Sequence, residues 1–420
     1  MTKKYKLDHI AKIEGHAGFV GSILDGKMED AKLEVKIGIR LFERLVINRP
    51  FEDIPVMVAR VCGVCPVVHH LTSIKALEKA MDIKPSVQTI KLRKIMQHGQ
   101  LIHSHSLHVF FLALADFFKL KHDVDLIKKF PDYTETALKV RDYGNNIVRK
   151  IGGRAVHPVS SVVGGFLKLP SKETLQELLD EQKEVLKIVS ELGELFSKLN
   201  YPNFERKTEY VTLQNKNEYA IYEGDVISNM GLKVEPSDYE SHVEEIHKPF
   251  EVVKRVKRDG REIFVGALPR INNNYNKLSP GAKKLIKNSG FKFPNYNTFL
   301  NVFAQVVEIV HCIEETGEWL KELLDSKQTK AITDYKVKAG KGAGIIEAPR
   351  GILYHYYEVD KQGIVRNSNI ITPTAQFISN LEKDVEAFFP QTKNMTNENR
   401  RRKIQMLIRA YDPCMTCTVH

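Results

Sequence analysis

The sequence has no long apolar run. A membrane-spanning helix needs about 18 consecutive apolar residues, and no stretch of the 420-residue chain reaches that length. The first residues, MTKKYKLDHIAKIEGH, lack the apolar segment of a secretory signal and pass directly into alternating polar and apolar positions. Internal repeats and low-complexity segments are absent as well. We therefore expect a globular protein of the cytoplasm, with export alongside a signal-bearing partner as the open alternative.

No part of the sequence concentrates charge of one sign. The net charge of +11 comes from 63 basic and 52 acidic residues that alternate along the whole chain. The densest basic run, KRVKRDGR at 254–261, is typical of a solvated turn between two strands, and the sequence holds no nucleic-acid-binding motif. We therefore expect no nucleic-acid partner.

Cysteine is scarce and unevenly placed. Of five cysteines, four form two C-x-x-C pairs, Cys62/Cys65 and Cys414/Cys417. In a chain without secretory features, such pairs indicate metal or redox chemistry more than a disulfide framework. Cys312 lies in an apolar helical stretch, where a free cysteine is most often a small buried hydrophobe.

The hydrophobic pattern predicts a mainly α fold of the α+β class. Residues 4–50 show the period-two alternation of a small antiparallel sheet, with an Asp-Gly turn at 25–26. Residues 60–200 and 296–420 are expected to form a bundle of long helices, and residues 205–280 a peripheral mixed subdomain. Helices are expected after the first cysteine pair and at about 85–118, 134–151, 171–200, 296–325 and 396–409. We expect these parts to form one domain, 1–420.

One long predicted helix carries a polar stripe. His98, His105 and Asp116 share a face by helical spacing, and His108 lies beside it. The apolar neighbours FFLALADFF favour a buried polar network over a solvent-exposed stripe.

The two cysteine pairs allow several kinds of site. Each C-x-x-C turn brings two thiolates close together, so two turns supply a four-sulfur site suited to zinc or an iron–sulfur cluster. A zinc knuckle usually closes a small local unit, whereas these pairs stand at opposite ends of the chain, and a thioredoxin-like motif needs a βαβ context that is absent. We favour one metal site that holds the segment YDPCMTCTVH in the core, because a frayed chain end could not bind a metal.

At these residues the chain resembles the large, catalytic subunit of nickel–iron hydrogenases. RVCGVCPVVH resembles that family's R-x-C-G-x-C-x-x-x-H motif, and DPCMTCTVH its D-P-C-x-x-C-x-x-H motif. Further segments follow in the family's order: KIEGHAG, GIRLFERLVINRP, HSLHVFFLALAD, GGRAVHPVSSVVGGF, VGALPRIN, EAPRG and TPTAQ. The resemblance covers nearly all of the chain, least clearly at 205–255 and 275–335. It implies the nickel–iron hydrogenase large-subunit fold and the reversible, heterolytic cleavage of dihydrogen to protons and electrons.

The resemblance also implies a cofactor. Cys62 and Cys414 would be terminal ligands of nickel, while Cys65 and Cys417 would bridge nickel to an iron that also carries carbon monoxide and two cyanides. Soft thiolates suit nickel. A non-catalytic relative of the complex I quinone-site subunit is the alternative from another class, but such subunits lack the four cysteines. A structural four-cysteine metal protein is the third possibility.

Further residues take roles through the same resemblance. Glu14 matches a proton-relay glutamate beside a nickel thiolate, and Arg350 matches an arginine over the metal centre. Asp116 and Asp412 match carboxylates that orient this arginine. The resemblance also implies that Pro373 and Thr374 flank a cyanide, and that His69 and His157 orient neighbouring groups without binding the metal. Two family positions differ, with Lys12 for the more frequent arginine and Pro269 for a small residue.

A second metal ion and several partners complete the expectation. Glu43 and His420 would bind magnesium or iron(II), and the chain, which stops at His420, resembles the mature form left by a maturation endopeptidase. Without a further iron–sulfur ligand set, the electrons would leave through an iron–sulfur small subunit. Similar cytoplasmic enzymes add flavin or iron–sulfur subunits and couple to NAD(P), a deazaflavin or ferredoxin, and some reduce sulfur.

Overall fold

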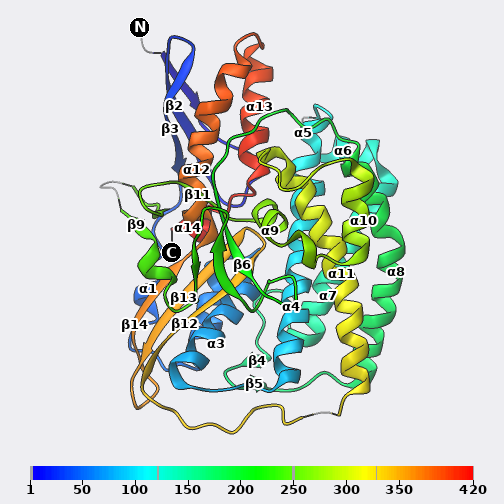
Figure 1. Cartoon of the computed structure of the whole chain (residues 1–420), viewed down its shortest axis with the longest axis vertical. Helices are drawn as coiled ribbons and strands as arrows, with labels where there is room; N and C mark the ends of the chain where they lie inside the picture. Colours follow the sequence, from blue (N-terminus) through cyan, green and yellow to red (C-terminus); the bar gives the residue numbers. More distant parts are fainter. Residues whose placement is uncertain (1–2, 121–122, 248–250, 328, 420) are drawn as a thin grey trace.

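The N-terminal sheet forms as predicted. The computed structural model describes residues 3–120, 123–247, 251–327 and 329–419 (Figure 1). Strands β1 (Lys3–Leu7), β2 (Ala17–Leu24) and β3 (Lys27–Val35) make an antiparallel sheet in that order. Asp25 and Gly26 join the last two strands with φ of 50° and 78°, the left-handed values that a type I′ hairpin turn requires.

Long helices lie side by side in one half of the molecule (Figure 1). They are α4 (Val87–Ser106), α7 (Pro131–Gly152), α8 (Lys172–Ser197), α10 (Pro280–Ser289) and α11 (Asn301–Asp325). Ser86 and Ser171 cap α4 and α8, each accepting a backbone N–H from the first turn at 3.1 and 3.2 Å. Cys312 is buried within α11. The bundle predicted from the apolar periodicity is therefore present.

The long helix predicted at about 85–118 changes its geometry near its end. After α4, residues Leu107–Ala113 form a π-helical turn before the short α5 (Leu114–Phe117). Such turns are rare and often lie at functional sites. The turn places His108 opposite α11, and Asp116 follows the turn, in α5.

The second half of the predicted helical core contains a sheet, which is a correction to the sequence-based expectation. Strands β12 (Gly340–Ala348), β13 (Gly351–Val359) and β14 (Val365–Ile371) form an antiparallel sheet inside the range 296–420. The sheet packs on α3 (Pro66–Met81). A Cβ at Gly342 would lie 2.2 Å from the backbone nitrogen of Ala80, so the helix approaches the strand closely only because glycine stands there. Helices α12 (Pro373–Phe388) and α13 (Asn397–Ala410) follow.

The mixed region at 205–280 reaches further into the core than predicted. Strands β11 (Ile263–Phe264), β6 (Glu209–Gln214), β7 (Asp225–Ser228) and β8 (Lys233–Val234) form one sheet in that order, and β6 is buried over its first five residues. A second pair joins β9 (Glu244–Ile246) to β10 (Arg255–Lys257). The basic run at 254–261, expected to be a solvated turn, contains strand β10, and only its second half forms a turn. Arg255 in that strand is buried against Glu382, with an Nη1–Oε2 distance of 2.5 Å.

Several short α-helices and strands connect these parts. They are α1 (Phe42–Leu45), α2 (Ile54–Val58), α6 (Asp123–Lys129), α9 (Ala267–Asn274), α14 (Met415–Thr418), β4 (Ser161–Val162) and β5 (Gly165–Phe166). Within the described residues, no helix combines the length and apolar character that crossing a membrane requires.

Candidate metal centre

The two cysteine pairs meet at one buried site, as the sequence predicts. Cys62 Sγ lies 3.6 Å from Cys414 Sγ, and Cys65 Sγ lies 3.7 Å from Cys417 Sγ. All four sulfur atoms lie within 4.8 Å of one another. Tetrahedral thiolate ligands with bond lengths of about 2.3 Å lie about 3.8 Å from one another. The contacts of 3.6 and 3.7 Å across the two pairs therefore have the spacing of thiolates that share a metal.

Helix starts position the thiols. Cys65 is the N-cap residue of α3, and Cys62 stands three residues before it. Cys414 is the N-cap residue of α14, and Cys417 lies within that helix. Cys62 Sγ also accepts the backbone N–H of Cys65 at 3.3 Å. An N–H aimed at sulfur favours the thiolate.

Backbone hydrogen bonds hold the C-terminal segment in place. The Met415 N–H donates to the Glu14 carbonyl at 2.9 Å, and the Arg40 N–H donates to the Val419 carbonyl at 2.8 Å. The segment thereby lies against two N-terminal loops and does not fray. His420, predicted to bind the second ion, lies outside the described residues.

The thiols influence one another's ionisation. The hydrogen bond from Cys414 lowers the pKa of Cys62 well below the usual thiol value. Hydrogen bonds with the neighbouring thiols, Cys414 first, raise the pKa of Cys417 well above the usual thiol value. A buried group of four thiols cannot lose all its protons without a cation to balance the charge. The donor set therefore fits a soft metal centre.

Glu14 contacts the cluster directly. Its Oε2 accepts hydrogen bonds from Cys414 Sγ at 2.9 Å and from the Thr416 hydroxyl at 2.7 Å. Burial, followed by the negative charge of Cys414, raises the pKa of Glu14 to about 7. The carboxyl group thus lies where it could exchange a proton with sulfur.

Arg350 lies on another side of the cluster, in the turn between β12 and β13. Its Nε donates to the Asp412 carbonyl at 2.6 Å and its Nη2 to Asp412 Oδ1 at 2.8 Å. Nη1 is buried and has no hydrogen-bond partner among the residues that the structure describes. A small cavity lies here, and its lining includes Arg350, Pro373, Thr374 and three of the cysteines. An unpartnered donor beside a cavity suits a ligand with an acceptor atom.

Asp116 does not contact Arg350, which corrects the expectation that it orients this arginine. It makes a bidentate ion pair with Arg409, whose Nε and Nη2 both lie 2.7 Å from its oxygens. The π-helical turn carries Asp116 toward α13, where Arg409 lies, and Asp412 alone of the two carboxylates reaches Arg350.

The histidine stripe is buried, and its members have separate partners. His98 contacts the Thr316 hydroxyl at 3.1 Å, and His105 contacts Glu308 at 2.9 Å. His108 contacts Gln305. All three partners belong to α11, so the polar network predicted from the apolar surroundings joins α4 and the π-helical turn to that helix.

Of three other predicted residues, His69 and Thr374 contact cysteines of the cluster, whereas His157 contacts the segment before Cys62. His69 contacts His355 through Nδ1 at 3.3 Å and Cys417 Sγ through Nε2 at 3.7 Å. His157 Nδ1 donates to the Ala59 carbonyl at 3.1 Å, three residues before the first cysteine. Thr374, which follows Pro373 at the start of α12, accepts the Cys414 N–H at 3.1 Å.

Glu43 has protein partners in the structure. Its Oε1 accepts from Lys254 Nζ at 2.6 Å and from the Ile370 N–H at 3.0 Å. A role for Glu43 in binding a second ion therefore stays a prediction.

Sequence reasoning missed several contributors. His355, Thr416, Gln305 and Arg409 all contact predicted site residues, but their pairings join segments far apart in the chain. Thr416 offered a signal, since it stands inside the second C-x-x-C turn. Nothing in the sequence marks Gln305 or Arg409.

The chain belongs to the nickel-dependent hydrogenase family, whose sequence profile matches residues 40–124 and 200–420, and it is a catalytic large subunit of that family. The non-catalytic and structural-metal alternatives are thereby set aside. Sulfhydrogenase 1 subunit alpha of Pyrococcus furiosus is 33% identical over 417 residues, covering 99% of this chain and 97% of that protein. Sulfhydrogenase 2 subunit alpha of the same organism is 29% identical over 420 residues, covering 99% and 98%.

A solved structure supports the same assignment. The crystal structure of an NAD+-reducing NiFe-hydrogenase in the H2-reduced state matches with a TM-score of 0.89 and 25% identity, covering 100% of this chain and 99% of that one. The predicted hydrogenase large-subunit fold is confirmed.

Proposed function

We propose that the four thiolates hold a nickel–iron centre at which this subunit cleaves dihydrogen reversibly. Cys62 and Cys414 would be terminal nickel ligands, and Cys65 and Cys417 would bridge nickel to iron. Carbon monoxide and two cyanides would complete the coordination of the iron. The observation that carries the proposal is the set of four buried sulfurs within 4.8 Å of one another. When bound, such a centre supplies the Lewis acidity and redox chemistry that dihydrogen cleavage needs.

The residues beside the cavity would hold the diatomic ligands. The buried Nη1 of Arg350 has an unused N–H in the described part of the chain, and cyanide offers an acceptor for it. Thr374 and Pro373 line the same cavity. The fixed positive charge of Arg350 would also stabilise negative charge that develops beside it.

Protons would leave through Glu14. The 2.9 Å contact between Cys414 Sγ and Glu14 Oε2 lets a proton pass from sulfur to the carboxylate without rearrangement. The Thr416 hydroxyl and N–H, at 2.7 and 3.2 Å, hold Oε2 in this position.

Electrons would leave through partner subunits. The relatives are named as subunits of larger hydrogenases, which supports a multi-subunit assembly. We propose an iron–sulfur small subunit as the direct partner, with flavin or further iron–sulfur subunits leading to NAD(P), a deazaflavin, ferredoxin or sulfur. A maturation endopeptidase acting on a precursor, a cytoplasmic location, and magnesium or iron(II) bound by Glu43 and His420 complete the proposal.

Metal analysis tests the centre itself. The purified complex should contain nickel in this subunit, together with iron, and the Cys65→Ser variant should lose both. Zinc in place of nickel and iron in the wild-type complex would instead support a structural metal role.

The Glu14→Gln substitution tests the proton route. We expect nickel and iron contents to stay at wild-type levels, because Glu14 is not a proposed ligand. Dihydrogen uptake and hydrogen–deuterium exchange should fall by about a hundredfold or more, since an amide cannot carry the proton. Wild-type rates in both assays would refute the role of Glu14.

A further inference from the structure

Among the described residues, the Arg350 guanidinium donates its hydrogen bonds to one residue, Asp412. Asp412 receives Nε through its carbonyl and Nη2 through Oδ1, at 2.6 and 2.8 Å. Asp412 itself has φ of 53°, a left-handed conformation, and stands two residues after the end of α13. The Nε contact depends on the Asp412 main chain and the Nη2 contact on its carboxylate, so whatever holds this carboxylate also holds the Nη2 end of the guanidinium.

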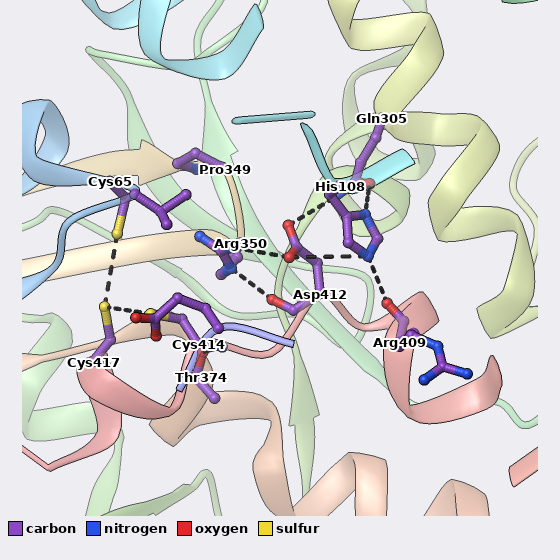
Figure 2. Close-up of polar contacts among 12 residues, drawn as sticks. Cys65, His108, Gln305, Pro349, Arg350, Thr374, Arg409, Asp412, Cys414 and Cys417 are labelled. Carbon is purple, nitrogen blue, oxygen red and sulfur yellow. Dashed lines mark hydrogen bonds and ion pairs between the residues drawn. The ribbon is translucent and has the colours of Figure 1, made fainter. Parts of the chain in front are cut away.

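Gln305 of α11 holds the other carboxylate oxygen. Its Nε2 donates to Asp412 Oδ2 at 3.2 Å, while its Oε1 lies 2.5 Å from His108 Nδ1 (Figure 2). The carboxylate can only accept, so the amide nitrogen must face Asp412 and the amide oxygen must face His108. In this orientation the Gln305 amide uses its N–H on Asp412 and presents its oxygen to His108.

His108 fixes Gln305 in turn. Its Nδ1 lies 2.5 Å from Gln305 Oε1, and its Nε2 lies 2.7 Å from the Arg409 carbonyl oxygen. Nε2 also lies 3.9 Å from Asp412 Oδ1, so the ring packs beside the same carboxylate as Arg350.

The π-helical turn makes this arrangement possible. His108 lies in Leu107–Ala113, and the altered helical geometry directs its ring into the space between α11 and the end of α13. Gln305, His108 and Asp412 are buried, at 1%, 2% and 3% exposure, so water does not readily replace a partner that is removed.

We propose that Gln305 is a positioning residue of the hydrogenase: its amide, fixed by His108, holds the Asp412 carboxylate and thereby aims Arg350 at the thiol cluster. The effect of replacing Gln305 on turnover rests on the proposed function of Arg350. The displacement of Arg350 is independent of that function, and the two effects can be measured separately.

The test compares Gln305→Leu with Gln182→Leu in the purified complex. Both remove a buried amide that packs at α11, but Gln182 lies on α8 and donates to the Ile313 carbonyl at 3.0 Å, away from the cluster. A crystal structure of Gln305→Leu should show Asp412 rotated, with no hydrogen bond between its carboxylate and Arg350 Nη2. With nickel content retained, kcat should fall about tenfold to hundredfold, as is typical when a supporting shell is removed. The infrared bands of the iron's diatomic ligands should shift, and the control should change neither kcat nor the bands.

A second variant keeps the test decisive if Gln305→Leu does not fold. Gln305→Met preserves the length of the side chain but removes the amide N–H that contacts Asp412. It should displace Arg350 in the same way, because Asp412 Oδ2 loses its donor. An unchanged Arg350–Asp412 hydrogen bond, or kcat and infrared bands equal to those of the control, would overturn the proposal. A wild-type complex without nickel and iron would refute the proposed function, and the position of Arg350 in the variant would still decide the role of Gln305.

Discussion

At the scale of single residues, burial determines which side chains can carry charge. His98 stacks on Trp319 with 4.7 Å between ring centres, and burial lowers its pKa to about 3. The Glu315 carboxylate opposes this shift, while His311 and Lys94 add to it. Burial likewise lowers the pKa of His70 to about 4 and that of His103 to about 3. The folded protein keeps these rings neutral where an unfolded chain would protonate them.

This difference predicts a loss of stability in acid. The unfolded chain takes up a proton at His98 near pH 6.5, but the folded chain does so only near pH 3. The free energy of unfolding therefore falls as the pH decreases from about 6.5 toward 3, by about 1.4 kcal/mol for each pKa unit of difference. Thermal melting across this range should show Tm falling. The fall should be shallower for His98→Gln, whereas a His16→Gln variant, altered at an exposed position, should follow the wild type; an equal slope in all three would contradict the prediction.

At the scale of elements, close helix packing supports the site. Helices α4 and α7 touch through two glycines, since a Cβ at Gly144 would lie 2.6 Å from the Gly99 carbonyl and 2.7 Å from the His103 nitrogen. The helix that carries His98 and His105 can take this position only while both sites lack side chains.

An added methyl group should therefore separate the two helices. We expect Gly144→Ala to lower the free energy of unfolding by about 1–3 kcal/mol, the usual cost of overpacking, because the clash is with backbone that cannot rotate away. Gly38→Ala is the matched control, since nothing lies within 4 Å of a Cβ at Gly38. Denaturant unfolding measures both, and equal stability of the two variants would contradict the packing argument.

Local signals in the sequence account for some elements and not for others. The Asp-Gly turn and the apolar periodicity of α8 and α11 are local signals, so the N-terminal sheet and the helix bundle were predictable. The sheet β12–β14 was missed because GKGAGIIEA is rich in small residues and low in the usual strand formers. Its glycines at every second position do have a period of two. They are needed because a Cβ at these positions would meet the backbone of α3, and this contact is not visible in the sequence.

At the scale of the whole molecule, the centre joins both ends of the chain. The cysteine pairs allowed this meeting to be predicted because four thiols on one metal must converge. The pairing of Asp116 with Arg409 could not be predicted, since helical spacing places Asp116 on the histidine face but does not reveal the π-helical turn that intervenes. Motif matches locate the residues of a site, and the partners of those residues depend on the packing of distant helices.

The final prediction concerns the C-terminal segment. A chain that stops after Met415 keeps the hydrogen bond from the Met415 N–H to Glu14, but it lacks the Cys417 thiol and the bond from the Thr372 hydroxyl to the Cys417 carbonyl. It should bind no nickel, because metal binding and the folding of this segment are coupled. A chain that stops after Val419 is the control, since it keeps both thiols and the Arg40–Val419 bond of 2.8 Å. It should retain nickel but lose part of the proposed second ion.

Metal analysis and limited proteolysis of both chains separate the role of the second C-x-x-C pair from the role of His420. Nickel bound by the Met415-terminated chain would show that the second C-x-x-C pair is not needed for the centre, whereas an unaltered metal content in the Val419-terminated chain would refute only the role of His420.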